Sequence, residues 1–267
     1  MASTVFVADM HLRPGARAEQ DALLARFCSQ LKASGARRLI FLGDTFNFWF
    51  ERCGRVVGDY EAVLARFADL ARAGVVMDMV SGNRDFMFGQ SVHDSAYYPG
   101  FFRGRPGANR VSRVVAAGIN PRGFNCRFTQ DGELVHCTHG DMYSLRASGH
   151  GMMRWWTMAL GPRMMSAWAP FWLLKLVFGA LQRRDTLPYR KLLPTTPLLE
   201  AETFTPMAAE GVRHIFCGHF HTGYRCLEVP GGSVTARLHI LPSWLHNGTY
   251  AFFKDGQVTL RSAADGA

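Results

Sequence analysis

Apolar and polar positions follow two different periods in the first third of the chain. Three apolar, β-branched runs, at 4–8, 38–42 and 75–81, predict strands, and each run ends in polar residues. Between them, the segments 16–34 and 59–73 carry apolar residues at helical spacing, such as Leu23, Phe27 and Leu31 in the first. Strands that alternate with helices predict a sheet with helices packed on its surface.

The pattern changes after residue 111. Short strands with Gly and Asn turns are expected there, including a turn at Asp131-Gly132 before a strand over 133–138. The last third, 212–260, is again rich in strands, with turns expected at 230–232 and at Asp255-Gly256. These runs predict a second sheet, so we expect residues 1–267 to form one domain with two packed layers of sheet.

The segment 142–210 has a different composition, rich in Met, Trp and Leu, and we interpret it as a helical cap inserted into this domain. Its longest uncharged run covers 164–174. A helix that spans a bilayer needs about 20 apolar residues. The cap is therefore not expected to cross a membrane.

Composition narrows the class of protein. With 48% hydrophobic and 19% charged residues, the chain is expected to fold, and its net charge of +9 favours a polyanionic partner: nucleic acid, an anionic membrane or a phosphorylated substrate. The 6 cysteines form no C-x-x-C pair, and no basic leader precedes the first apolar run. Both features favour a reduced, cytoplasmic location.

Polar clusters follow five of the predicted strands. They are Asp9-x-His11, Gly43-Asp44, Gly82-Asn83-Arg84-Asp85, His139-Gly140-Asp141 and Gly218-His219-Phe220-His221. Each cluster alone is common at the end of a strand, but α/β sheets bind their ligands at the carboxyl ends of strands, where all five are expected. We expect an extended backbone at Asp9 and His11, which would direct both side chains to one side.

The clusters contribute two Asp, one Asn and four His as potential metal ligands. Oxygen and imidazole ligands without thiolates suit Mn²⁺, Fe or Zn²⁺, and seven are too many for one tetrahedral ion. They suit two ions that share a carboxylate and activate a water molecule, which makes a nucleophilic side chain unnecessary. The sequence has neither a Gly-x-Ser-x-Gly elbow nor a Walker loop.

Taken together and in order, the five clusters resemble the signature of the calcineurin-like metallophosphoesterases along nearly the whole chain. This resemblance implies a four-layer α/β/β/α sandwich with two divalent metal ions. It implies that one ion is held by Asp9, His11, Asp44 and His221, and the other by Asp44, Asn83, His139 and His219, with Asp44 as the bridge. Catalysis would then involve Asp44, Asn83, Arg84, His139 and His219, and substrate binding would involve Asn83, Arg84 and His219.

Within that superfamily, the run Gly-Asn-Arg-Asp-Phe, the apolar insertion and Ser243-Trp244 are similar to the UDP-2,3-diacylglucosamine pyrophosphohydrolases of lipid A biosynthesis. This similarity implies an Mn²⁺-dependent enzyme that is peripheral to the cytoplasmic face of the inner membrane. Water attack on the substrate's pyrophosphate would give UMP and 2,3-diacylglucosamine 1-phosphate.

Arg84 stands where most of the superfamily has a His that helps to protonate the leaving group. A guanidinium suits a diphosphate because its planar fork binds phosphoryl oxygens and cannot act as an acid. An ion pair between Arg84 and Asp85 is the alternative. The cap would line an acyl chamber and bring basic residues to lipid headgroups; plain core packing is the alternative reading of its apolar residues.

Two departures from the pyrophosphohydrolases concern the substrate. The Ser, Asn and Lys cluster of their cap is absent from 182–191, and an acidic residue expected near Arg146 and Ala147 is missing. Another lipid-linked or nucleotide phosphodiester is therefore an alternative substrate. A nucleic-acid phosphodiesterase would need a basic groove interleaved with aromatic residues, so no nucleic-acid partner is expected.

Two further alternatives are a protein phosphatase and a binding scaffold without activity. A phosphatase would leave the apolar cap without a purpose, and a scaffold usually has eroded metal ligands, whereas all seven are present here. No obligate protein partner is evident.

Overall fold

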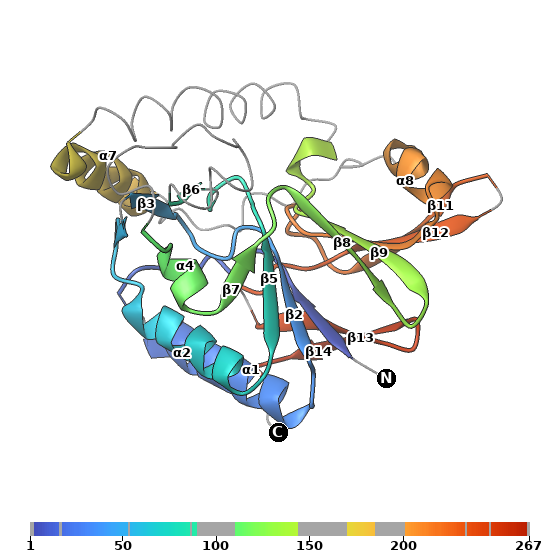
Figure 1. Cartoon of the computed structure of the whole chain (residues 1–267), viewed down its shortest axis with the longest axis horizontal. Helices are drawn as coiled ribbons and strands as arrows, with labels where there is room; N and C mark the ends of the chain where they lie inside the picture. The colour runs from blue at the N-terminus through green and yellow to red at the C-terminus, as the bar shows by residue number, and fades with distance from the viewer. Residues whose placement is uncertain are drawn as a thin grey trace.

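Two β-sheets that face each other form the body of the molecule (Figure 1). The computed structural model describes residues 3–15, 18–52, 54–85, 87–89, 110–143, 170–184, 201–232, 234–245 and 247–265. The first sheet has six strands in the order β14 (Gln257–Ser262), β13 (Thr249–Lys254), β1 (Thr4–Val7), β2 (Arg38–Leu42), β5 (Val76–Val80) and β7 (Ile119–Pro121). The second has five, in the order β11 (Arg225–Pro230), β12 (Thr235–Ile240), β10 (Val212–Cys217), β9 (Glu133–Thr138) and β8 (Asn125–Gln130).

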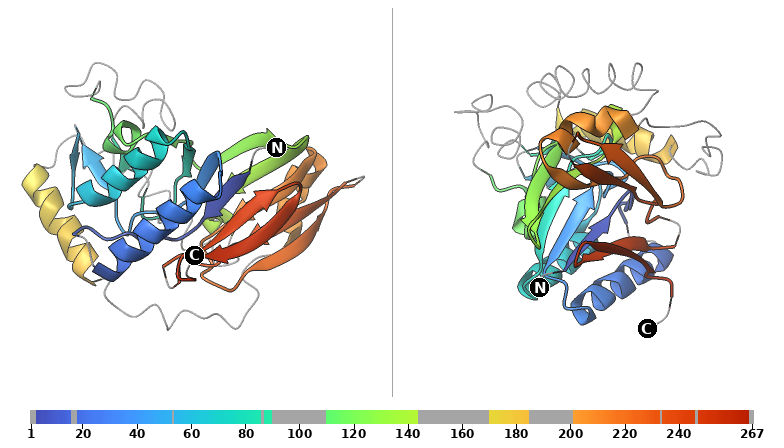
Figure 2. Two further views of the ribbon diagram at one scale, coloured as in Figure 1. Left: turned by 90° about the horizontal axis from the view of Figure 1, so that it is seen from below. Right: turned by 90° about the vertical axis from the view of Figure 1, so that its right-hand side faces the viewer.

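Helices cover the outer face of each sheet. On the first sheet these are α1 (Ala18–Ala33), α2 (Glu61–Arg72) and the short α4 (Arg113–Ala116), which share one apolar core with the strands (Figure 2). On the second sheet they are the 3₁₀ helix η5 (Ala201–Phe204) and α8 (Thr205–Ala209), whose Phe204 and Ala208 are fully buried against the strands. The predicted four-layer α/β/β/α fold is therefore confirmed.

A third apolar cluster fills the space between the two sheets. At its centre the rings of Phe6 and Phe216 stack with centroids 3.8 Å apart, and Phe253 meets both rings at steeper angles. All three side chains are fully buried. Each such side chain contributes ~3 kcal/mol through removal from water, so this cluster fixes the position of one sheet on the other.

The strands that precede the polar clusters lie in the middle of their sheets. β1, β2 and β5 run parallel to one another, with Val5 paired to Leu39 and Leu39 to Met77, and β9 runs parallel to β10. Their carboxyl ends therefore meet at the same edge of the sandwich. The predicted strands and helices of the first third are confirmed to within a few residues.

Three features of the topology differ from the sequence prediction. The last hairpin, β13–β14, does not extend the second sheet; β13 pairs antiparallel with β1 and completes the first sheet. Residues 113–116 form a helical turn before the strand β7, which also joins the first sheet. A small third sheet of β4 (Arg55–Val56), β3 (Phe50–Arg52) and β6 (Met87–Phe88) was not predicted at all.

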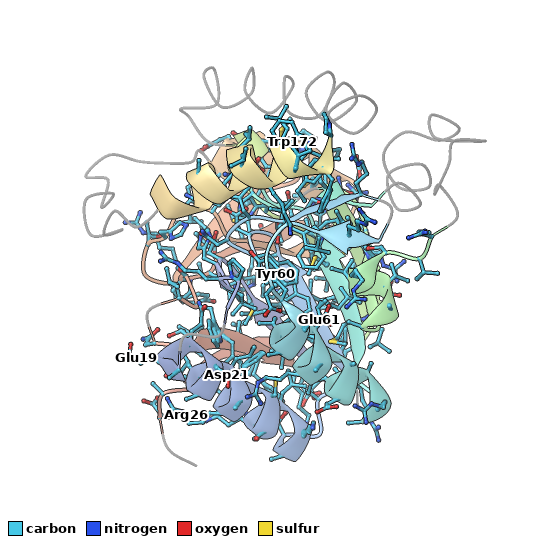
Figure 3. All side chains as sticks on the ribbon, turned by 90° about the vertical axis from the view of Figure 1, so that its left-hand side faces the viewer. Glu19, Asp21, Arg26, Tyr60, Glu61 and Trp172 are labelled. Atoms are coloured by element: carbon cyan, nitrogen blue, oxygen red, sulfur yellow. The ribbon has the colours of Figure 1, made fainter. Side chains whose placement is uncertain are left out.

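Most of the predicted cap, 142–210, lies outside the described residues. The 3₁₀ helix η2 (Asp141–Tyr143) stands at its beginning, η5 and α8 stand at its end, and helix α7 (Phe171–Arg184) lies within it. Leu174 of α7 is fully buried against the third sheet, whereas Trp172 and Leu176 are each 63% exposed. Figure 3 shows Trp172 on α7, at the opposite end of the molecule from Asp21 and Arg26 of α1.

Among the described residues, no helix has the length and apolar character that crossing a membrane requires. Cys28, Cys126, Cys137, Cys217 and Cys226 are free thiols.

Two imidazoles lie buried in the second sheet. His214 on β10 and His239 on β12 are each 3% exposed, and Nδ1 of His214 lies 3.0 Å from Nε2 of His239. Burial, with His214 and Arg237 nearby, lowers the pKa of His239 to about 3. Burial also lowers the pKa of His214. The folded chain therefore keeps both rings neutral at pH values where the unfolded chain is protonated.

This arrangement predicts a loss of stability in acid. The contribution of a neutral His239 is complete above about pH 6.5 and is lost as the pH falls toward 3, because only the unfolded chain gains a proton over that range. With His239→Leu, the free energy of unfolding should fall less steeply between pH 6.5 and 4, by up to ~1.4 kcal/mol per pH unit. Urea unfolding of both proteins across that range measures the two slopes, and equal slopes would contradict the assignment.

Candidate metal centre

The seven predicted ligands lie on five loops that follow β1, β2, β5, β9 and β10. Asp9, His11, Asp44 and His139 are almost completely buried, whereas His221 is partly exposed. Asp9, His11, Asp44 and Asn83 come from the first sheet, and His139, His219 and His221 come from the second. The site therefore forms only where the two sheets meet.

The backbone at these residues differs from the expectation. Asp9 (φ 53°) and His11 (φ 45°) adopt the left-handed conformation, so the prediction of an extended chain at this motif is wrong. Asp44, His219 and His221 share this conformation, with φ between 49° and 74°. It costs a non-glycine residue roughly 1–2 kcal/mol.

Backbone hydrogen bonds between neighbouring loops hold this conformation. The N–H of His11 donates to the carbonyl of Asp44 at 2.9 Å, and the N–H of Leu12 donates to the carbonyl of Thr45 at 2.9 Å. The Ser243 hydroxyl donates to the carbonyl of Asp9 at 2.8 Å, which gives the late Ser-Trp segment a place in the site.

One group of side chains gathers around Asp9. Nε2 of His11 and Nε2 of His221 lie 3.3 Å apart, and they lie 4.0 Å and 3.5 Å from Asp9 Oδ1. Asp44 Oδ2 is 4.0 Å from Nε2 of His11. Asp9 Oδ1 is buried and accepts no hydrogen bond within the described part of the chain. The two imidazole nitrogens and an oxygen of Asp9 thus converge within 4.8 Å of one another, as the ligands of one cation do, and Asp44 lies beside them.

A second group gathers around His139. Its Nδ1 lies 2.8 Å from the carbonyl oxygen of Leu42, a contact that requires the proton on Nδ1 and leaves the lone pair on Nε2. Nε2 then lies 3.0 Å from Oδ1 of Asn83 and 3.7 Å from Oδ1 of Asp44. All three atoms are electron-pair donors, so a cation suits this position better than a hydrogen bond does.

His219 stands beside the second group. The centroids of the His139 and His219 rings are 5.0 Å apart, and the backbone N–H of His219 donates to Asp9 Oδ2 at 2.8 Å. The structure thus brings all seven predicted ligands into two adjoining groups. Asp9 lies close to both groups, within 4.8 Å of ligand atoms of Asp44 and His139 as well as of His11 and His221.

Electrostatics favour positive charge at this place. Burial and the nearby Asp44 raise the pKa of Asp9 well above its usual range, and burial also raises the pKa of Asp44. Burial and His221 lower the pKa of His11 well below its usual range. Carboxylates and neutral imidazoles that are crowded together in this way fit divalent cations, which would supply the compensating charge.

Asp85 has a role that the sequence did not reveal. Its carboxylate accepts four backbone N–H bonds, from Gly82 (2.9 Å), Asp44 (3.0 Å), Thr45 (2.6 Å) and Phe46 (3.2 Å). These bonds tie the loop after β5 to the loop after β2. Asp85 is fully buried and thereby positions Asp44 without reaching the centre itself.

The two loops also approach too closely for any residue but glycine at position 82. A Cβ atom there would lie 2.1 Å from Asp44 Oδ1 and 2.3 Å from the Asp44 nitrogen. The glycine of this motif is therefore required by its distance from Asp44.

Arg84 lies over Asp44. Its backbone N–H donates to Asp44 Oδ1 at 2.9 Å, and its Nε is 3.8 Å from Asp44 Oδ2. One guanidinium N–H donates to Asn47 Oδ1 at 3.2 Å, a fully buried partner that the sequence did not indicate. The oxygens of Asp85 are occupied by backbone N–H groups, so the alternative in which Asp85 is the main partner of Arg84 is not supported. The Arg84 side chain is 21% exposed and thus accessible to a ligand.

Comparison with known proteins finds relatives that carry the name UDP-2,3-diacylglucosamine hydrolase. The chain is 26% identical to a "UDP-2,3-diacylglucosamine hydrolase" of Aeromonas hydrophila over 98% of this chain and 99% of that protein. It is 24% identical to a protein of the same name from Porphyromonas gingivalis, over 97% of each chain. No family model matches the chain.

Among solved structures, a dimetal phosphatase from Danio rerio is similar with a TM-score of 0.46 and 13% sequence identity, over 98% of this chain and 95% of that one.

Replacement of Asp85 by Asn tests its positioning role. The amide keeps the shape, but its NH₂ group would face backbone N–H donors, and the lost charge-assisted bonds are worth roughly 2–3 kcal/mol. We expect the free energy of unfolding to fall by about that amount and the bound metal per chain to fall severalfold, measured by urea unfolding and elemental analysis.

Asp255→Asn is the matched control, because Asp255 lies in an exposed Asp-Gly turn whose left-handed backbone Asn also tolerates. Asp85→Asn protein that retained full metal content would show that Asp44 does not depend on the Asp85 carboxylate.

Proposed function

We propose that this chain, a calcineurin-like metallophosphoesterase related over its full length to proteins named UDP-2,3-diacylglucosamine hydrolase, cleaves the pyrophosphate of an acylated UDP-sugar. Its predicted class, a metal-dependent phosphoester hydrolase, is confirmed. The proposed substrate is UDP-2,3-diacylglucosamine and the proposed products are UMP and 2,3-diacylglucosamine 1-phosphate. The observation that carries the proposal is the convergence of Asp9, Asp44 and the histidine nitrogens in two adjoining groups.

The proposed centre holds two divalent ions, which we take to be Mn²⁺. Asp9, His11, Asp44 and His221 would hold one ion, and Asp44, Asn83, His139 and His219 the other. When bound, such a pair lowers the pKa of a water molecule and offsets the negative charge of phosphoryl oxygens. The water oxygen would form a bond to one phosphorus of the diphosphate as the bond from that phosphorus to the bridging oxygen breaks. The bridging oxygen would leave with the other phosphate, and the proton from the water would pass to solvent.

Arg84 suits this reaction because the leaving group is a phosphomonoester. A phosphomonoester is a weak base, with a second pKa near ~6, so it departs without protonation. An alkoxide would need an acid, and Arg84 cannot supply one. Its guanidinium, positioned by Asn47 and Asp44, would instead bind oxygens of the diphosphate.

The exposed surface of helix α7 favours a substrate that carries acyl chains. Trp172, Leu173, Leu176 and Val177 are all exposed on this helix, and Lys175 lies among them. An apolar surface with basic residues suits acyl chains or an anionic lipid surface. We therefore propose a peripheral contact of α7 with the cytoplasmic face of the inner membrane. The departure at Arg146 and Ala147 lies outside the described residues, as does most of the departure at 182–191.

The first test is release of UMP. Metal-stripped protein resupplied with Mn²⁺ should release UMP from UDP-2,3-diacylglucosamine, beside the generic substrate bis-p-nitrophenyl phosphate. Without added metal, both rates should fall at least about 100-fold, because no side chain replaces the activated water. Hydrolysis of the generic ester alone would refute the acylated UDP-sugar and favour another lipid-linked or nucleotide phosphodiester.

Arg84→Ala tests the link between this residue and the diphosphate. Loss of charge-assisted bonds worth ~1.5–3 kcal/mol should lower kcat/KM for UDP-2,3-diacylglucosamine about 10- to 150-fold. The rate for bis-p-nitrophenyl phosphate should change only a few-fold, because that substrate has one phosphoryl group.

Arg72→Ala is the control, since Arg72 is 77% exposed on α2. Bound metal is measured in each variant, because Arg84 also contacts Asp44. If Arg84→Ala lowered the rates for both substrates equally at equal metal content, Arg84 would have no specific role in recognising the diphosphate.

A further inference from the structure

A chain of hydrogen-bonded side chains crosses the second sheet and ends on the loop that carries His219 and His221. Tyr224 Oη lies 2.9 Å from His239 Nδ1, and His239 Nε2 lies 3.0 Å from His214 Nδ1. His214 Nε2 in turn lies 3.0 Å from Glu133 Oε2 at the beginning of β9.

The chemistry of these groups fixes the direction of the chain. An ionised Glu133 only accepts, so His214 must carry its proton on Nε2. A neutral His214 then accepts at Nδ1, which requires that His239 donate from Nε2 and accept at Nδ1. Within the described part of the chain, the group that donates to His239 Nδ1 is then the Tyr224 hydroxyl. Each histidine thus has one tautomer. Tyr224, at the end of the loop, is hydrogen-bonded through His239 to the interior of the second sheet.

The two histidines of this series lie in an apolar environment. His239 stacks on Phe216 with centroids 4.5 Å apart, and His214 packs against Phe253 at 4.8 Å. Buried polar groups are stabilising only when each is satisfied, and a satisfied network defines one arrangement of its parts. An apolar pair would fill this space but would remove His239 Nδ1, the acceptor that lies 2.9 Å from the Tyr224 hydroxyl.

The loop 218–224 is fixed at its other end by the metal centre. The N–H of Gly218 donates to the carbonyl of His139 at 3.0 Å, and the N–H of His219 donates to Asp9 Oδ2 at 2.8 Å. Between the two ends, His221 has φ of 49°, a conformation that its surroundings must impose. Tyr224 follows it by three residues.

We propose that Tyr224, His239 and His214 are positioning residues that hold the loop 218–224 in the conformation that presents His219 and His221. The inference rests on the proposed function only for the identity of what the two histidines bind.

The hydrogen bonds from Tyr224 through the two histidines to Glu133 keep this donor-to-acceptor order at neutral pH. His239 faces His214 from β10, Tyr224 and Cys226 from the β11 side and Arg237 from its own strand; His214 also faces Glu133 and Arg213. Burial lowers the pKa of His239 to about 3 and raises the pKa of Tyr224 to about 12. Neither group changes charge between pH 5 and 9 on this basis, so the loop should be held equally across that range.

Tyr224→Phe tests the proposal in metal-free protein. The amides of His219 and Phe220 are hydrogen-bonded, and their hydrogen exchange should become about tenfold faster, the ratio that one lost hydrogen bond supplies. Tyr250→Phe is the matched control, because Tyr250 also donates its hydroxyl to a side chain, Gln30, but lies on β13. That variant should exchange at the parent rate at both amides.

Two variants at His239 separate positioning from a general loss of stability. Gln has an acceptor and a donor, so His239→Gln should keep the parent exchange rates, whereas His239→Leu should match Tyr224→Phe. In the double variant His239→Leu with Tyr224→Phe, the two amides should exchange no faster than in either single variant, because both changes break the same hydrogen bond. In the metal-loaded state, Tyr224→Phe should weaken Mn²⁺ binding by about tenfold.

Parent-like exchange in Tyr224→Phe, or equal acceleration in Tyr250→Phe, would overturn the positioning role. If the parent protein bound no Mn²⁺, the dinuclear centre would be refuted, and the exchange rates would still decide whether Tyr224 holds the loop.

Discussion

The crowding of carboxylates at one buried place is the constraint on which the rest of this structure depends. Asp9, Asp44 and Asp85 lie buried near one another, and burial together with the neighbouring Asp44 raises the pKa of both Asp9 and Asp85. Asp85 is compensated by four backbone N–H bonds, and Asp9 and Asp44 face imidazoles and a guanidinium. A centre of this kind tolerates little displacement, since a shift of any loop leaves a buried charge uncompensated. The left-handed residues and the close approach at Gly82 are the backbone consequences of that requirement.

The apolar contact between the sheets performs the other half of this positioning. The ligands come from both sheets, so their distances depend on how the sheets pack. The stacked rings of Phe6 and Phe216 lie on strands that lead directly to Asp9 and to His219. Close packing transmits small displacements rather than absorbing them. Catalytic geometry and core stability are therefore coupled in this fold.

The sequence predicted most strands of the two main sheets and the convergence of seven polar side chains, because apolar periodicity and polar strand ends are local features. The four-layer order came from the family resemblance. The sequence did not predict that Asp9 and His11 are left-handed, since that conformation is imposed by hydrogen bonds to residues 44 and 45. The roles of Asp85 and Asn47 were invisible for the same reason: their partners are about 40 residues away along the chain or lie in another loop. The return of β13–β14 to the first sheet is likewise a matter of long-range pairing, which alternation within a hairpin does not encode.

The small third sheet connects the polar centre to the apolar helix. β3 begins at Phe50, shortly after Asp44 and Asn47, and β6 begins at Met87, directly after the loop of Arg84 and Asp85. Phe50 pairs with Met87 across this sheet, and Leu174 of α7 is buried against both. The segments that carry Asp44, Asn47 and Arg84 thus continue directly into the strands that support α7. Such short, packed connections fix an apolar surface at a set distance from Asp44 and Arg84, which is the arrangement that the proposed substrate, with its charged head and acyl chains, would require. A nucleic-acid substrate would give α7 no comparable reason to expose Trp172 and Leu176.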